Sequence, residues 1–298
     1  MANPTQTIVA FIGLGVMGLP MAKRLLAGGF DVVATDLSAD AMEAFVEADG
    51  RTAKNIVEVA PVTDFVITML PNGQIVRDAL LGDMGFAMSL RTDTLIIAMS
   101  SSAPLETRGL REDLKILGLD LIDAPVSGGA RRAEDGSLAI MVGGAPAMIE
   151  KARPLLKAMG STVTATGEIG SGHAAKALNN YVSAAGLQAA CEAILIGREF
   201  GIDPNVLTDV LNLSTGKNHS TEVKLKPFII PENFTSGFAM ALMAKDIETA
   251  ASLARQLGKP EPGLEHAAAL WKESLERVGK AADHTEIYSY LKVARQDR

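Results

Sequence analysis

Lys176 and Asn180 have the types and the spacing to handle a proton and a hydrogen bond at one site. They follow Gly170-Ser171-Gly172, at the head of an alanine- and leucine-rich run that continues to about Phe200. Residues four apart lie on one helical face, so both side chains are expected to point the same way. A lysine whose charged form is disfavoured by burial can exchange protons near neutral pH. The alternative is a solvated lysine beside a helix-capping asparagine, and the segments before this run decide between the two.

The composition is that of a globular chain with room for two domains. Its 298 residues are 48% hydrophobic and 21% charged, and charged residues interrupt every long apolar run, so we expect no membrane span. A net charge of −7 speaks against nucleic acid or an anionic membrane surface as a partner. The single cysteine, Cys191, excludes an internal disulfide, and neither it nor the histidines have metal-ligand spacing, so we expect no metal. Because no signal-peptide pattern is visible, we expect a cytoplasmic protein.

The first apolar run ends in a glycine-rich turn of the dinucleotide-binding type. Residues 8–12 read as a buried parallel strand, an amphipathic helix follows the turn, and a second strand over 31–35 leads to Asp36. In this context the helix N-terminus favours phosphates, and Asp36 would bind the ribose hydroxyls and repel a 2′-phosphate. We therefore expect NAD as cofactor, preferred over NADP; a glycine turn without a ligand is the alternative. The turn consists of Gly13, Leu14, Gly15, Val16, Met17 and Gly18.

Strand and helix signals alternate up to about residue 166, and helix signals dominate afterwards. This order predicts an α/β chain: a doubly wound Rossmann sheet over residues 1–166, followed by an all-helical domain over 167–298. Further strands are expected over 65–70, 95–99, 119–124, 138–142 and 162–166, and helices over 147–159, 173–200, 204–214, 237–257, 262–278 and 284–294.

Four segments, in one order and spacing, resemble the β-hydroxyacid dehydrogenases. This family is related to 6-phosphogluconate dehydrogenase and includes 3-hydroxyisobutyrate dehydrogenase and tartronate semialdehyde reductase. The segments are residues 11–18, residues 123–129 (Asp-Ala-Pro-Val-Ser-Gly-Gly), the Lys176–Asn180 stretch, and Lys245-Asp246. The resemblance implies an N-terminal NAD-binding domain, a helical domain for substrate and oligomerisation, and an active site in the cleft between them. It also implies a homo-oligomer, a dimer or a tetramer.

The resemblance implies a role for each matched residue. In such enzymes the lysine matching Lys176 is the general acid/base, and the asparagine matching Asn180 helps to hold the substrate. Asp123 is expected to be structural, because a carboxylate beside an anion site would repel the substrate. An ordinary turn at 127–129 and a surface lysine at 245 are the alternatives. The implied substrate-binding residues are Ser127, Gly128, Gly129 and Asn179, and the implied cofactor-binding residues are Leu70, Pro71, Ser101 and Lys245.

These patterns predict an NAD-dependent oxidoreductase that interconverts a short 3-hydroxy acid and its semialdehyde or keto form. The alternatives are a reductase of tartronate semialdehyde or another polar aldehyde-acid, and a non-catalytic NAD-binding scaffold. A decarboxylating enzyme is disfavoured because Asn179 stands where those relatives carry histidine, and an imine reductase because Lys176 is retained. The polar loop 214–221 either lies in solvent or contacts the substrate. In the second case Lys217 or Lys224 would form an ion pair with a second anionic group of the substrate. The identity and chirality of the hydroxy acid, the direction and the oligomer size stay open.

Overall fold

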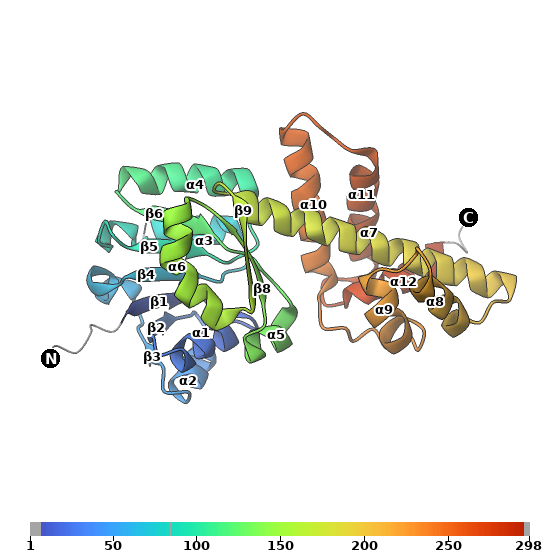
Figure 1. Cartoon of the computed structure of the whole chain (residues 1–298), viewed down its shortest axis with the longest axis horizontal. Helices are drawn as coiled ribbons and strands as arrows, with labels where there is room; N and C mark the ends of the chain where they lie inside the picture. The colour runs from blue at the N-terminus through green and yellow to red at the C-terminus, as the bar shows by residue number, and fades with distance from the viewer. Residues whose placement is uncertain (1–6, 84, 295–298) are drawn as a thin grey trace. The chain divides into compact units, whose positions relative to one another are not determined.

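The first half of the chain forms a mostly parallel sheet. The computed structural model describes residues 7–83 and 85–294, and contacts divide the chain into units at 1–176 and 177–298 (Figure 1). The described strands run in the order β3-β2-β1-β4-β5-β6-β8-β7, with β9 beside β8. All pairs from β3 to β6 are parallel, whereas β8 is antiparallel to β6 and β7. The strands are β1 (Ile8–Ile12), β2 (Asp31–Thr35), β3 (Arg51–Thr52), β4 (Phe65–Thr68), β5 (Leu95–Ala98), β6 (Asp120–Asp123), β7 (Val126–Ser127), β8 (Ala139–Gly143) and β9 (Thr162–Gly167).

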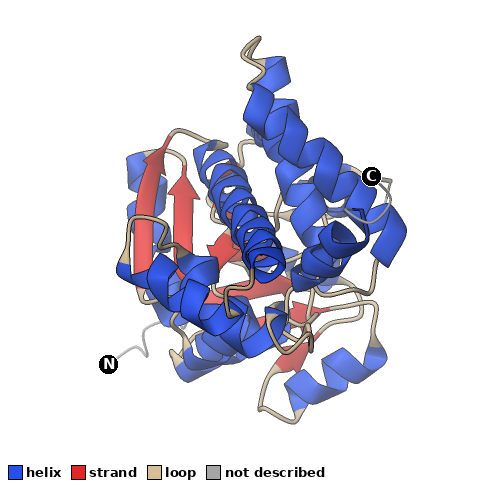
Figure 2. Ribbon diagram, turned by 90° about the vertical axis from the view of Figure 1, so that its right-hand side faces the viewer, coloured by secondary structure: helices blue, strands red, loops and turns tan. Residues whose placement is uncertain are grey.

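Helices cover both faces of this sheet, which explains the continuous apolar runs of its strands. Side chains of α1, α2, α5 and α6 share one buried cluster with one face of the strands, and those of α3 and α4 share another with the opposite face. Figure 2 shows the red strands of this unit flanked by blue helices. The helices are α1 (Gly18–Ala27), α2 (Ala39–Val46), α3 (Gly73–Leu81), α4 (Pro104–Ile116), α5 (Gly129–Asp135) and α6 (Pro146–Met159), with short 3₁₀ turns at 56–58, 60–62 and 87–89.

The second unit is helical. Helix α7 (Ser171–Phe200) begins in the first unit and continues into the second. In the core of the second unit, the buried residues Trp271 and Tyr288 pack with the apolar faces of α7, α10 and α11. Pro204 opens α8 and Pro262 opens α11, as expected for proline in a first helical turn. The remaining helices are α8 (Pro204–Leu213), α9 (His219–Val223), a π-helix (Leu225–Ile229), α10 (Met240–Gln256), α11 (Pro262–Val278), a 3₁₀ turn (His284–Glu286) and α12 (Ile287–Ala294).

The predicted fold class, a Rossmann sheet followed by a helical region, is confirmed. None of the helices in the described ranges has the length and apolarity needed to cross a membrane. The polar loop predicted over 214–221 needs a correction, because α9 begins at His219. Asn218 accepts hydrogen bonds from the N–H groups of Ser220 and Thr221, and the Thr221 hydroxyl accepts one from the Asn218 N–H. This reciprocal cap explains a helix in a segment without apolar periodicity.

Candidate active site

The glycine turn after β1 packs directly against the end of β4. Gly13 has φ +99°, and a Cβ there would lie 2.3 Å from the Met69 carbonyl oxygen, so only glycine fits. A Cβ on Gly18 would lie 1.9 Å from the Gly13 oxygen, which explains the third glycine of the turn. The strand order reverses at β1, with β2 on one side and β4 on the other. The turn therefore lies at the switch point where sheets of this kind bind ligands.

The middle of the turn leaves its backbone open. Gly15 is exposed, and apart from Gly15 and its two chain neighbours no heavy atom of the described chain lies within 4 Å of the place that its Cβ would take. Among the described residues, no side chain caps the start of α1 at Met17. Open main-chain N–H groups at a helix start favour anions such as a pyrophosphate. The turn thus fits a dinucleotide.

Asp36 lies against this turn. Its Oδ2 accepts a hydrogen bond from the Leu14 N–H at 2.6 Å, and its Oδ1 accepts one from the Ser38 N–H at 2.8 Å. Each carboxylate oxygen keeps a second acceptor position. The apolar side chains of Val16, in the turn, and of Leu37, the residue after Asp36, are exposed. A carboxylate held here can accept hydrogen bonds from the hydroxyls of a ribose.

A buried serine fixes the loop with Leu70 and Pro71. The Ser100 hydroxyl accepts a hydrogen bond from the Leu70 N–H at 2.8 Å, which ties the loop after β4 to the loop after β5. Ser100 is fully buried, whereas its neighbour Ser101 is half-buried and Pro71 is exposed. From the sequence, Ser101 is predicted to contact the cofactor, and no role is predicted for Ser100. The structure assigns Ser100 the work of positioning Leu70.

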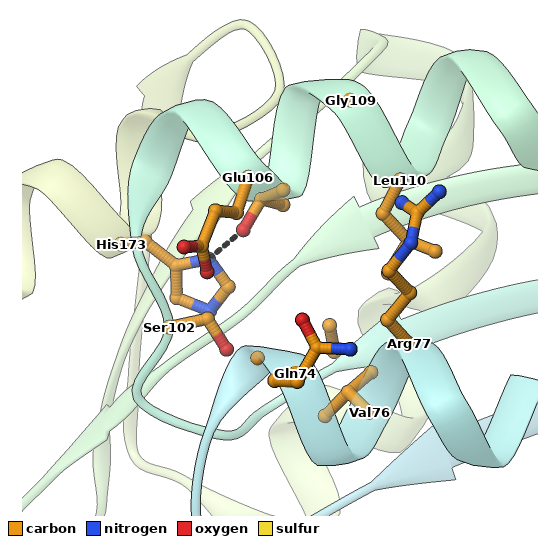
Figure 3. A pocket seen from close by; sticks show the side chains of 11 residues that line it. Gln74, Val76, Arg77, Ser102, Glu106, Gly109, Leu110 and His173 are labelled. Carbon is orange, nitrogen blue, oxygen red and sulfur yellow. Dashed lines mark hydrogen bonds between the residues drawn. The ribbon is translucent and has the colours of Figure 1, made fainter.

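A cavity of about 260 Å³ opens between α3 and α4, beside these two loops. In Figure 3 the His173 ring, the Glu106 carboxylate and Ser102 lie on one side, and Arg77 lies on the other. Arg77 also pairs with Asp113. Three of the cavity's lining residues are buried and apolar: Val76, Ala98 and Leu110. The lining includes Ser102, which follows Ser101, and Gly73, two residues after Pro71, so the cavity lies beside the predicted cofactor loops.

The start of α7 is anchored by a buried carboxylate. Asp123, fully buried at the end of β6, accepts hydrogen bonds from the N–H groups of Gly170 and His173, each at 2.7 Å. The His173 ring lies with Nε2 2.8 Å from the Ser100 carbonyl oxygen and with Nδ1 2.8 Å from the Thr107 hydroxyl. An anion at a helix N-terminus is stabilising, so this geometry fits the structural role expected for Asp123. Lys176, which is 8% exposed, follows one turn later.

The predicted carboxylate-binding turn lies between β7 and α5. Val126 and Ser127 pair with β8, so Ser127 closes a short strand that the sequence argument placed in a loop. Gly128 has φ +136°, and a Cβ on it would collide with the side chain of Arg132. Gly129 opens α5. The turn therefore places main-chain N–H groups and the half-buried Ser127 hydroxyl at one edge of the sheet.

In the second unit, Asn180 is held by an acid from another helix. Asn180 Nδ2 donates to Asp246 Oδ2 at 2.6 Å, and both residues are buried. Asn180 Oδ1 accepts from Nδ2 of the exposed Asn179 at 3.1 Å. Because a carboxylate only accepts, Asp246 fixes which end of the Asn180 amide is nitrogen. Lys245 is half-buried; burial lowers the pKa of its ammonium, and Asp246 opposes that shift.

Two lysines expected to read the substrate have partners within the second unit. Lys217 forms an exposed ion pair with Glu222 at 2.8 Å. Lys224 is buried, with its Nζ 2.6 Å from His284 Nε2, so the expectation that it pairs with a second substrate anion is wrong. Within residues 7–83 and 85–294, no cluster of three or more His, Cys, Asp or Glu side chains could hold a metal ion.

Three residues hold candidate site segments within their own units although the sequence predicts no role for them: Ser100 and His173 in the first unit and Asp246 in the second. His173 lies three residues before Lys176, a spacing that places it on the same helical side, and it was given no function. Asp246 forms part of a matched motif, and an acid in a row of Met, Ala and Leu was its signal. The partners of all three are distant in sequence, so spacing could not identify them.

Comparisons with known proteins match both parts of the chain. Residues 8–167 match the NAD-binding domain of 6-phosphogluconate dehydrogenase, and residues 170–291 match the model described as the NAD-binding part of NADP-dependent 3-hydroxyisobutyrate dehydrogenase. Relatives include 2-(hydroxymethyl)glutarate dehydrogenase of Eubacterium barkeri (35% identity, covering 85% of this chain and 84% of the relative) and 3-sulfolactaldehyde reductase of Escherichia coli K12 (35% identity, 85% of each). A solved structure of Mycobacterium tuberculosis 3-hydroxyisobutyrate dehydrogenase with L-serine has a TM-score of 0.90 at 30% identity, covering 97% of this chain and 100% of that one.

Proposed function

Because the chain belongs to the β-hydroxyacid dehydrogenase family, we propose that it is an NAD-dependent oxidoreductase of a short 3-hydroxy acid and its semialdehyde or keto form. The main support for this proposal is the arrangement of residues in the first turns of α7. Its start is fixed by Asp123 and His173, the buried Lys176 follows one turn later, and Asn180 follows one turn after that. A scaffold without chemistry has no need of a buried lysine held in this way.

The glycine turn and Asp36 are the proposed cofactor site, together with Leu70, Pro71, Ser101 and Lys245. The open backbone at Gly15 and the uncapped start of α1 suit a pyrophosphate, and Asp36 suits a ribose. When bound, NAD supplies the hydride acceptor in oxidation and, as NADH, the hydride donor in reduction.

Lys176 is the proposed proton carrier. In oxidation its neutral amine takes the proton of the substrate hydroxyl while a hydride leaves the same carbon, and in reduction its ammonium returns the proton to the new alkoxide oxygen. The Ser127 hydroxyl, the N–H groups of Gly128 and Gly129, and Asn180 with its neighbour Asn179 would hold the substrate carboxylate. Their contribution is to position the reacting carbon.

Cofactor preference follows from Asp36. A 2′-phosphate would meet its carboxylate, and the next residues, Leu37 and Ser38, offer no positive charge. We expect kcat/KM with NAD to exceed that with NADP by at least about tenfold, equal to about 1.4 kcal/mol. Asp36→Ser should shrink this ratio, whereas Asp40→Ser, on the exposed start of α2, should leave it unchanged. Equal efficiency of the wild-type protein with both cofactors would contradict the assignment.

The substrate class is tested by a panel of 3-hydroxy acids assayed with NAD and with NADP. It includes 3-hydroxyisobutyrate, glycerate, threonate and sulfonated analogues, and the matching aldehydes are assayed with NADH. We expect turnover of at least one short 3-hydroxy acid. Tight NAD binding without turnover of any compound would favour the scaffold alternative, and turnover of polar aldehyde-acids alone would favour a tartronate semialdehyde type of reductase.

We also propose a homo-oligomer, with residues 1–166 as the NAD-binding domain and 167–298 as the substrate and oligomerisation domain. Val182 and Phe200 of α7 are 68% and 85% exposed, and Leu178 and Ile196 lie on the same stripe. An exposed apolar stripe of this kind marks an interaction surface. Light scattering should give the mass of a dimer or tetramer, and Phe200→Asp should lower that mass. A monomeric wild type would refute the proposed homo-oligomer.

Location in the cytoplasm stays a prediction.

A further inference from the structure

A buried group of titratable side chains in the second unit takes no part in the proposed chemistry. It joins Lys224, at the end of α9, to Asp283 and His284, just before α12. Lys224 is 8% exposed and His284 is 2% exposed, although both can carry charge. Lys224 Nζ and His284 Nε2 lie 2.6 Å apart. Buried charge is costly unless paired, so this arrangement needs a counter-charge.

Asp283 supplies that charge. Its carboxylate accepts hydrogen bonds from the N–H groups of Gly237, Phe238 and Thr285 and from the hydroxyls of Ser236 and Thr285, at 2.6 to 3.2 Å. Burial alone would raise the pKa of Asp283, but the hydrogen bonds, with that from His284 the largest, outweigh burial and hold the pKa well below its usual range. The carboxylate is therefore ionised at neutral pH and in mild acid.

The contacts of His284 define where its hydrogen lies. Nδ1 is 3.0 Å from the Phe238 carbonyl oxygen, 3.1 Å from Ser236 Oγ and 3.3 Å from Asp283 Oδ1. All three can accept, because Ser236 gives its own hydrogen to Asp283. Nδ1 thus carries the hydrogen, and in the neutral ring Nε2 accepts from the Lys224 ammonium. Burial lowers the pKa of His284 and the Lys224 charge lowers it further, and together they outweigh the hydrogen bond and charge of Asp283, which raise it. Burial also lowers the pKa of Lys224 to about 8.

This group joins two chain segments at the start of α10. The His284 N–H donates to the Phe238 carbonyl, the Met240 N–H donates to the Ala282 carbonyl, and Ala239 forms a bridge with Asp283. Helix α10 begins at Met240 and carries Lys245 and Asp246, of which Asp246 holds Asn180. Whatever loosens residues 236–240 therefore loosens the helix that orients a proposed substrate-binding side chain.

We propose that Lys224, His284 and Asp283 form an acid-sensitive lock on the start of α10. With a neutral His284 ring the lock positions Asp246 and, through it, Asn180. A second proton on the His284 ring would place an Nε2–H against the Lys224 ammonium. One carboxylate would then face two positive charges, so the ring and the ammonium would have to separate.

Other ionisable residues lie near this group. They are Cys191 of α7, whose thiol pKa is raised by burial, Glu192 beside Cys191, and Glu286, which accepts a hydrogen bond from the Asp283 N–H. The effect on turnover rests on the proposed function, whereas the opening itself does not.

The sign of the pH effect follows from linkage. Because the pKa of His284 is lowered from 6.5 in the folded chain, the unfolded chain binds more protons as the pH falls below that value. The stability that His284 contributes is present above about pH 6.5 and is lost as the pH falls toward the folded pKa. The lock should therefore open in mild acid.

The test compares the full-length wild type with His284→Gln, Lys224→Met and the control His266→Gln, an exposed histidine of α11. Trp271, the sole tryptophan, is buried on α11, which packs on α10, so its fluorescence reports the opening without any substrate. We expect the wild type and the control to show an acid transition with a midpoint below about pH 6.5. His284→Gln should lose the transition because its amide does not titrate. Lys224→Met should move the midpoint to lower pH, because burial still opposes the second proton on the ring but the ring then faces no ammonium.

Turnover supplies the readout that a merely structural role would not move. Below about pH 6 we expect kcat of the wild type to fall at least about threefold further than kcat of Lys224→Met, after each is normalised to its value at neutral pH. Lys176 is present in both proteins, so its own effect on the pH profile cancels when the normalised kcat values are compared. If His284→Gln does not fold, Lys224→Met carries the test alone. A fluorescence transition that persists in folded His284→Gln, a midpoint that does not move in Lys224→Met, or a kcat profile that is the same in all proteins overturns the proposal. Absence of turnover would instead contradict the proposed function and leave the fluorescence result valid.

Discussion

Replacing Lys176 by alanine is expected to lower kcat by about 10²- to 10⁴-fold, the usual loss when general acid–base catalysis is removed. Affinity for NAD should stay nearly unchanged, because the proposed cofactor contacts of the first unit lie in the glycine turn, at Asp36 and in the loops after β4 and β5. The measurement is single-turnover hydride transfer followed at the NADH absorbance, together with NADH binding by fluorescence.

Two further variants separate the proton from the charge. Lys176→Arg keeps a positive charge of similar reach but cannot give up its proton near neutral pH, so it should be about as slow as the alanine variant. Lys272→Ala, on the exposed side of α11, is the control and should behave like the wild type. If Lys176→Ala keeps more than about a tenth of the wild-type rate with chemistry rate-limiting, Lys176 is not the proton carrier. If Lys176→Arg is fast, the side chain acts through its charge.

The elements of the sheet could be predicted because their signals are local. Continuous apolar runs bounded by glycine or aspartate identified the strands at 8–12 and 31–35 to the residue. Helix α11 was also predicted with its correct bounds, since Pro262 opens it and Gly279 follows it. Helix α9 was missed, because a helix of five residues in a polar segment is defined by its cap and carries no apolar stripe.

The supports of the candidate site could not be predicted, because they join residues far apart in the chain. Asp123 meets the His173 N–H across 50 residues, and Lys224 meets His284 across 60. A helical or strand period states which face a side chain lies on, but not which distant residue packs there. Resemblance to a family supplies the residues proposed for the chemistry, whereas the partners that hold them had to be read from the structure.

The pair Asn180 and Asp246 gives the second large effect. Their hydrogen bond is buried, measures 2.6 Å and has a charged acceptor, a type worth about 1.5–3 kcal/mol. Asn180→Ala and Asp246→Ala are each expected to lower kcat/KM by roughly 10- to 100-fold, because Asn180 holds the substrate only in the orientation that Asp246 imposes. Glu248→Gln, an exposed acid on the same helix, is the control and should have little effect.

A double-mutant cycle decides whether the two residues act as one unit. If Asp246 works by orienting Asn180, the double variant should be little worse than the worse single variant, since the second substitution removes an orientation that no longer matters. Asp246→Asn should recover part of the activity, because its carbonyl oxygen can still accept from the Asn180 amide. Asp246 also raises the pKa of Lys245, so the Kd for NADH is measured in parallel. If the two losses of kcat/KM multiply in the double variant, Asp246 acts on its own and not through Asn180. If a weaker NADH affinity accounts for the whole loss, Asp246 acts through Lys245.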